Sequence, residues 1–262
     1  MAWWIAAAMM QITSSTPALE ASGKWALDAA SHGCVVTQSF SDGQAQLSIA
    51  SPPLAHQLVI SAKLAAPSKM LKSKTLAIVI GPGGERLKGT PLNFAPPGIQ
   101  SREFGISVDP EKVPYHAIRD LSFEYDGHIL ATFKTGSWAA LPKAIEECSR
   151  DLMIDYGIDP ERERQVAISA VPKSVGTLIL ESKISDDARD QRVKGELGMR
   201  VQVGADGRIE QCTPVTSSGN KDIDERSCNL LIDKGRYVTA KDRHFVAVAS
   251  EQLVFVRWVI AQ

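Results

Sequence analysis

Five histidines are the side chains of this sequence that could ligate a metal ion or transfer protons near neutral pH. They are scattered along the chain: His32, His56, His116, His128 and His244. None of them belongs to an HExxH pair, the helical spacing that places two zinc ligands on one face. His32 and Cys34 would share one face of a strand, but two ligands do not complete a zinc site. We therefore predict that the protein binds no metal.

The glycine-rich segment 81–84 could present backbone amides to a phosphate group. A P-loop needs a lysine after its last glycine, whereas Thr90 follows Gly89 here, and Pro82 has no amide hydrogen to donate. No GxSxG motif marks a nucleophilic serine. The acidic pairs of the chain fit helix starts or solvated helix surfaces: Asp186 with Asp187, Asp222 with Asp224, and Glu146 with Glu147. The sequence therefore predicts a non-enzymatic protein without a cofactor.

Four cysteines could form two disulfides, because their number is even: Cys34, Cys148, Cys212 and Cys228. Two of them fall in each of the two domains expected below. In an oxidising compartment this distribution favours the pairs Cys34–Cys148 and Cys212–Cys228 among the three possible connectivities. The second pair would close a short loop and contribute about 3 kcal/mol in the chain-entropy model. The alternative for the second pair is two buried free thiols.

The elements that would position these groups are clearest near the carboxyl end. Hydrophobic residues alternate with polar ones and glycine from Leu197 to Val203, which predicts a strand with one buried face. The turn 204–207 leads into a returning strand, Arg208 to Val215, which ends at the turn residues 217–220. A strand rich in β-branched and aromatic residues, Leu253 to Ile260, closes the chain.

A helix is expected between the hairpin and the last strand. Asp222 and Glu225 have the spacing of a capping box with Asp222 as the cap. Ile223, Leu230 and Leu231 fall on one helical face behind it. Cys228 would then lie on a helix that packs against the hairpin strand carrying Cys212.

This order of elements resembles the C-terminal domain of the TonB energy transducers. The matching residues are Gly195, Asp206-Gly207-Arg208, Ser217-Ser218-Gly219-Asn220, Ile223-Asp224, Arg236-Tyr237 and Val256-Arg257-Trp258-Val259. The segment Ser185 to Arg189 is similar to the short leading helix of the family, with Ser185 as its N-cap. The resemblance covers residues 180–262, and it departs from the family after Tyr237, where Val238-Thr239-Ala240 replaces Pro-Ala.

The resemblance implies a binding function. In that family the domain recognises an extended segment of an outer-membrane transporter, which adds as a strand to an exposed sheet edge. The last strand is the expected edge, with Arg257, Trp258 and Phe255 as candidate contact residues and with Arg236 and Tyr237 as second choices. The alternative for Trp258 and Tyr237 is that both are core residues. An open edge strand also allows a homodimer through strand pairing.

The whole chain has 262 residues, a hydrophobic fraction of 44% and a net charge of −1. This length and composition are typical of two globular domains. A balanced charge argues against a nucleic-acid partner.

The segment Trp3 to Met10 is an apolar run of eight residues near the amino end. It is shorter than the about 20 residues that span a membrane, so it predicts a cleaved signal peptide over residues 1–21 and a periplasmic protein. No Lys or Arg precedes Lys24, although a signal peptide usually begins with one. The alternatives are an uncleaved inner-membrane anchor and a cytoplasmic chain.

The region 22–159 predicts a mostly antiparallel β domain of no assigned family, closed by one helix. Short β-like runs alternate with Gly, Pro and Ser: Cys34 to Phe40, Ala45 to Ala50, Gln57 to Leu64, Leu76 to Ile80, Phe104 to Val108, Leu121 to Tyr125 and His128 to Phe133. Asp126-Gly127 predicts a hairpin turn between the last two. The helix is expected from Trp138 to Tyr156, with Cys148 on its buried face.

The predicted fold class is therefore α+β, with a TonB-like domain over residues 175–262. The charged stretch Glu161 to Arg164 is expected to be a linker, followed by a strand from Val175 to Glu181. Two functions remain open. One is an energy transducer that engages an outer-membrane transporter; the other is a soluble periplasmic scaffold that binds another envelope protein or cell-wall glycan.

Overall fold

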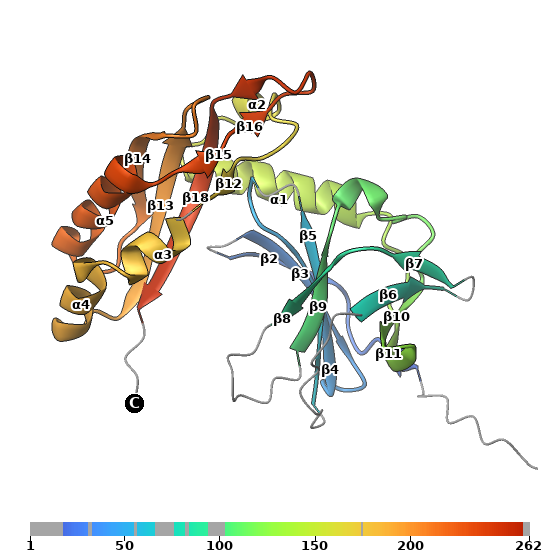
Figure 1. Ribbon diagram of the computed structural model, residues 1–262. Coiled ribbons are helices and arrows are strands. Elements are labelled where there is room, and N and C mark those ends of the chain that lie inside the picture. Colours follow the sequence, from blue (N-terminus) through green and yellow to red (C-terminus); the bar gives the residue numbers. More distant parts are fainter. Residues whose placement is uncertain are drawn as a thin grey trace, which may run out of the picture.

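The computed structural model describes residues 18–30, 33–54, 57–65, 76–81, 84–93, 103–173 and 175–258. The predicted α+β class is confirmed. Figure 1 shows a β-rich first domain and a second domain of strands and helices, with the helix α1 (Leu141–Asp155) running along the top of the first domain toward the second.

The first domain is built around a six-stranded antiparallel sheet of order β2-β3-β4-β5-β9-β8. Its strands are β2 (Ala26–Ala30), β3 (Gly33–Phe40), β4 (Ala45–Ser51), β5 (Leu58–Leu64), β9 (Glu103–Val108) and β8 (Thr90–Asn93). Alternate residues of β3 to β5 are buried, among them Leu47, Ile49 and Ile60. This alternation is the pattern that predicted strands with one buried face.

A second sheet of order β1-β11-β10-β6-β7 packs on the first. Its strands are β1 (Leu19–Glu20), β11 (His128–Lys134), β10 (Asp120–Tyr125), β6 (Leu76–Ile80) and β7 (Glu85–Leu87). Phenylalanines of the two sheets meet edge to face, since the ring centroids of Phe40 and Phe133 lie 5.0 Å apart. The predicted hairpin turn has positive φ at both Asp126 and Gly127, as a type I′ turn requires.

Strand β1 lies at the expected end of the signal peptide. Leu19 and Glu20 pair in parallel with β11, and Lys134 Nζ lies 2.5 Å from Glu20 Oε1. Ala21 forms an isolated bridge with Phe40. Residues 19–21 therefore pair with strands of the first domain, and the expected cleavage after residue 21 stays a prediction; residues 1–17 of the predicted leader lie outside the described residues.

Helix α1 closes the first domain and is stapled to its first sheet. It begins three residues after the expected Trp138, whose indole is buried and donates to Thr135 Oγ1 at 2.8 Å. Cys148, half-buried on α1, forms a disulfide with the fully buried Cys34 of β3. The short turn η1 (Pro110–Lys112) follows β9.

The charged stretch expected to be a linker is instead the helix α2 (Pro160–Glu163). Asp159 caps it by accepting from the amide of Glu161. Glu163 is buried rather than solvated, with 7% of its surface exposed. The boundary near Asp159 agrees with the cores, because the second core begins at Val166.

The second domain contains a three-stranded antiparallel sheet of order β14-β13-β18. Its strands are β13 (Gly195–Val203), β14 (Ile209–Thr216) and β18 (Ser250–Trp258). The helices α3 (Val175–Leu180), α4 (Lys183–Asp190) and α5 (Lys221–Lys234) lie together on one side of it in Figure 1. Leu197, Met199 and Val201 are fully buried beneath them. The expected disulfide Cys212–Cys228 ties β14 to α5.

Three local expectations for this domain are wrong. The segment predicted as a strand from Val175 is helix α3, because Val175 and Ile179, one helical turn apart, are both buried in the core. Helix α4 is capped by Ser182, whose hydroxyl accepts from the amide of Ile184, and not by Ser185. Helix α5 is capped by Asn220 rather than by Asp222.

Two small ladders extend the second domain at one end. Strand β12 (Val171–Pro172) pairs with β15 (Tyr237–Val238), and β16 (Ala240–Lys241) pairs with β17 (Ala247–Val248). Ile168 bridges to Lys241, so the chain before α3 and the chain after α5 lie side by side. The second ladder lies after Tyr237, where the sequence departs from the family.

The two disulfides indicate an extracytoplasmic protein, because such bonds are rare in the reducing cytosol. Among the described residues, no helix is both long enough and apolar enough to cross a membrane.

Candidate functional site

Strand β18 lies at an edge of the second sheet. Its nine residues pair in continuous register with the nine residues of β13. In an antiparallel ladder the backbone groups of alternate residues point toward the partner strand and away from it. The amide of Glu251 points away, since it donates to Glu163 Oε1 at 3.0 Å. The amides of Leu253 and Arg257 therefore point outward as well.

This outward side, from Leu253 to Arg257, is called the β18 edge below. Its upstream limit is the carboxylate of Glu163, which occupies the first outward amide. Within the described part of the chain, no backbone hydrogen bond reaches the outward amides of Leu253 and Arg257. Outward backbone groups at a sheet edge are a template for another strand.

Side chains beside the β18 edge are fixed by contacts across the sheet. Arg257 donates from Nε and Nη2 to Glu196 Oε2, at 3.1 and 2.8 Å, and most of its side chain is exposed. The ring of Phe255 lies 6.3 Å from that of Tyr156, at the end of α1. The β18 edge therefore carries one exposed cation, Arg257, and Phe255 of the same strand lies beside Tyr156 of the first domain.

The structure separates the other predicted contact residues from this edge. Trp258 and Tyr237 are 9% and 3% exposed and belong to the core of the second domain. Of the two interpretations of these rings, the core interpretation therefore holds. Arg236 forms a bridge with Arg208, at the start of β14, so it lies at the opposite side of the sheet.

The chain was compared with protein-family models, with curated proteins and with solved structures. No match was found in any of the three comparisons.

The upstream end of the β18 edge is also the junction between the two domains. Arg200 of β13 donates to the carbonyl oxygens of Tyr156 and Gly157, at the end of α1. Its Nε lies 4.0 Å from Oε2 of Glu251, and that oxygen accepts no hydrogen bond from any described residue. Glu163 approaches from α2. Two carboxylates and one guanidinium therefore meet where α1, α2 and the second sheet join.

Burial raises the pKa of both carboxyl groups at this junction. Loss of solvation raises the pKa of Glu163 to about 7, an effect that the hydrogen bond from the Glu251 amide opposes and the nearby Glu251 carboxylate reinforces. Burial also raises the pKa of Glu251, while Arg200 and Arg162 act against the rise. This pair could not be predicted from the sequence, because its members are 88 positions apart.

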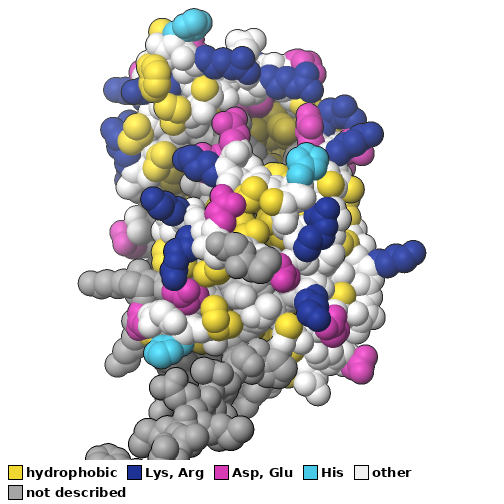
Figure 2. Space-filling model, turned by 90° about the vertical axis from the view of Figure 1, so that its right-hand side faces the viewer, with side chains coloured by type: hydrophobic (Ala, Val, Ile, Leu, Met, Phe, Trp, Pro, Cys, Tyr) yellow, Lys and Arg dark blue, Asp and Glu magenta, His cyan; other side chains and the backbone are white. Residues whose placement is uncertain are grey.

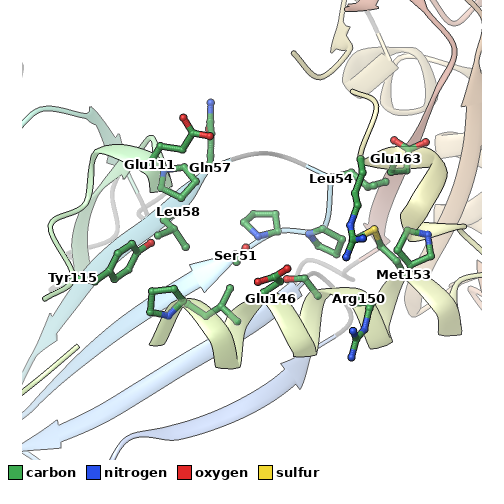
Figure 3. A pocket seen from close by; sticks show the side chains of 18 residues that line it. Ser51, Leu54, Gln57, Leu58, Glu111, Tyr115, Glu146, Arg150, Met153 and Glu163 are labelled. Atoms are coloured by element: carbon green, nitrogen blue, oxygen red, sulfur yellow. The ribbon is translucent and has the colours of Figure 1, made fainter. Parts of the chain in front are cut away.

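A recess of about 420 Å³ runs along α1 on the first domain. Figure 3 shows Tyr115 and Glu111 toward one end of it, and Met153 and Glu163 toward the other. Prolines and aliphatic side chains form most of its walls: Pro52, Pro53, Leu54, Leu58, Pro142 and Ile145. Burial raises the pKa of Tyr115 to about 12, so its phenol stays protonated. Sequence reasoning missed this recess, since its walls come from four separate segments.

The remaining candidates bring no chemistry together in the described residues. No group of three or more His, Cys, Asp or Glu side chains there could hold a metal ion. His116, His128 and His244 are exposed and belong to different elements. His32, His56 and the middle of the glycine-rich segment lie outside the described residues.

Proposed function

We propose that this chain is a non-enzymatic periplasmic binding protein with a TonB-like second domain. Its β18 edge binds an extended segment of an outer-membrane transporter or of another envelope protein by strand addition. The two disulfides indicate that the protein lies outside the cytoplasm. That it lies in the periplasm, and that it binds such a partner, is proposed.

One observation carries this proposal: a nine-residue strand ends the described second domain at a sheet edge, with outward amides at Leu253 and Arg257. Strand addition draws its affinity from main-chain hydrogen bonds and little from particular side chains. Two side chains at the β18 edge limit where and how a peptide strand can bind. Glu163 blocks its upstream end, and exposed Arg257 favours an acidic residue on the peptide near the downstream end.

The sheet and helices also agree with what the resemblance implied. The hairpin β13–β14, the helix α5 and the final strand β18 follow in the expected order, and the last strand is at an edge. A resemblance in the order of elements supports a binding mode but does not name the partner.

The first domain favours a second candidate function, a scaffold without energy transduction. A transducer of this family carries a Pro-rich spacer, whereas the described residues between 18 and 159 of this chain form a two-sheet domain closed by a disulfide. Such a domain suits a soluble periplasmic protein that holds two partners near each other. Fractionation with N-terminal sequencing of the mature protein separates the two candidates: an uncleaved chain in the membrane fraction favours the transducer.

N-methylated peptides test strand addition directly. Peptides from the periplasmic segments of outer-membrane transporters are titrated into the full chain by calorimetry, and one that binds is N-methylated at successive positions. Methylation removes a backbone donor, so we expect weaker binding at every second position only. Uniform loss, or no loss, would show that the peptide does not bind as a strand.

Two proline variants locate the strand on the protein. Leu253→Pro removes an outward amide that β13 does not use, so the fold should persist while peptide binding falls. Val254→Pro removes an inward amide and should destabilise the second domain itself. Peptide binding that survives in a folded Leu253→Pro protein would place the site elsewhere, and a dimer that this variant dissolves would show that β18 pairs with a second copy.

A further inference from the structure

Exposed hydrophobic side chains gather at the end of the second domain that carries the two small ladders. Nine large hydrophobic residues are exposed in the described chain, and five of them lie on these ladders or beside them: Ile168, Val171, Val238, Phe245 and Val246. Val171 pairs directly with Val238, and Ile168 bridges to Lys241 at the base of the β16–β17 hairpin. Pairing of the ladders therefore concentrates residues that are far apart in sequence.

The tip of this hairpin, residues 242–246, is built to project Phe245. Asp242 Oδ1 accepts from the amides of His244 and Val246, at 2.8 and 2.9 Å, and the Asp242 carbonyl accepts from the Phe245 amide at 3.0 Å. Phe245 has a φ of 61° and is 72% exposed. A bulky residue rarely adopts this left-handed conformation. Here the turn holds the ring in solvent, and no core contact compensates for the strained backbone.

Basic residues lie at the tip and along the two ladders. Segments 166–173 and 236–248 contain four basic residues, Lys173, Arg236, Lys241 and Arg243, and one acidic residue, Asp242, which gives a net charge of +3 in a chain whose total is −1. The one acidic group is occupied by the amides of its own turn. Figure 2 shows hydrophobic and basic side chains, with some acidic ones between them, at the upper end of the molecule, where Figure 1 places the β16–β17 hairpin.

We propose that this tip docks on an anionic phospholipid bilayer. Phe245 and Val246 would enter the interface between headgroups and acyl chains, and Lys241 and Arg243 would meet the phosphate groups. Aromatic and aliphatic residues beside Lys and Arg are the combination that peripheral proteins use at this interface. The excess of positive charge complements anionic lipids. This inference concerns a different surface from the β18 edge and does not depend on strand addition.

Sedimentation of the full chain with vesicles tests the proposal. Vesicles of phosphatidylcholine alone are compared with vesicles that also contain phosphatidylglycerol. We expect binding to the anionic vesicles, weakening as salt screens the charges. The double variant Phe245→Asn, Val246→Ser should bind at least about tenfold more weakly, because it removes two buried apolar groups. Asn tolerates positive φ, so this variant should fold.

Two further variants make the test specific. Lys241→Gln with Arg243→Gln should lower binding to anionic vesicles by roughly fivefold for each charge. Ile129→Ser, at an exposed hydrophobic residue of β11 in the first domain, is the matched control and should bind as the unaltered chain does. Equal binding of the tip variants would overturn the proposal. The proposal would also be overturned if the unaltered protein did not bind vesicles and formed an oligomer that the Phe245 variant dissociates. The tip would then be a contact between copies of the protein.

Discussion

Replacing Glu163 by Gln should remove most of the pH dependence of stability that arises at the domain junction. Glu163 is buried and accepts the amide of Glu251, and burial raises its pKa from 4.5 to about 7. Between these two pH values the folded state binds more protons than the unfolded state. The free energy of unfolding should therefore fall as the pH rises through this window and level off above it.

The size of the effect follows from the same two pKa values. A pKa raised from 4.5 to about 7 sets a ceiling of about 3 kcal/mol on the stability lost over the window. Water screens part of this charge, so we expect a loss of about 1 to 2 kcal/mol. Gln keeps an oxygen that can accept the Glu251 amide but cannot ionise. Glu163→Gln should therefore match the unaltered protein at low pH and exceed its stability at high pH by about that amount.

Urea unfolding from about pH 4 to about pH 9, on both sides of the window, measures this difference. Glu251 contributes a slope of the same sign, because its pKa is also raised by burial, so the double variant with Glu251→Gln should be the flattest. Glu161→Gln is the control on the same helix, since Glu161 is exposed and forms a surface ion pair with Arg164. A stability that rises with pH in the unaltered protein, or a full slope retained in Glu163→Gln, would refute the reasoning.

Three other predictions concern stability of the second domain. Replacing Cys212 and Cys228 by Ser opens a link across 16 positions and should cost about 3 kcal/mol in urea unfolding, a difference that should vanish when both proteins are reduced. Asp224→Ala should lower the free energy of unfolding by about 2 to 4 kcal/mol, because the hydroxyls of Ser217 and Ser218 and the amide of Ser218 lose the carboxylate to which they donate. The control Asp222→Ala removes an exposed carboxylate on the same helix and should lower it by less than about 1 kcal/mol. Gly207→Ala should lower the melting temperature, because Gly207 has a φ of 80° and a new Cβ would collide with the Tyr237 carbonyl; an unchanged melting temperature would contradict this.

Much of the architecture could be predicted because alternation and turn chemistry are local. Strands β3, β4, β5 and β9 of the first sheet and the Asp126-Gly127 turn are found close to where the pattern places them, whereas β2 and β8 were not predicted. The predictions that were wrong depend on contacts between residues far apart in the sequence. The run from Val175 is short and apolar, so its pattern fits a strand or a helix, and packing of Val175 and Ile179 in the core decides for the helix.

The candidate site was only partly predictable. The last strand could be expected at an edge from the order of elements, but the outward amides follow from the register with β13. The burial of Trp258 and Tyr237 could not be told from their types, because aromatic rings serve cores and contact surfaces alike. Glu163 looked solvated within a charged stretch, and only its approach to Glu251 of β18 makes it a buried group.

The bond between Cys34 and Cys148 has a mechanical consequence. It joins β3 to α1 across 114 positions, so tension applied at the two ends of the chain would pass from one sulfur to the other and on into α1. The strands between them would carry no load, and on the order of 400 Å of hidden contour length would stay folded. In any tether that includes this chain, the segment between Cys34 and Cys148 therefore cannot extend until a reductant cuts the bridge.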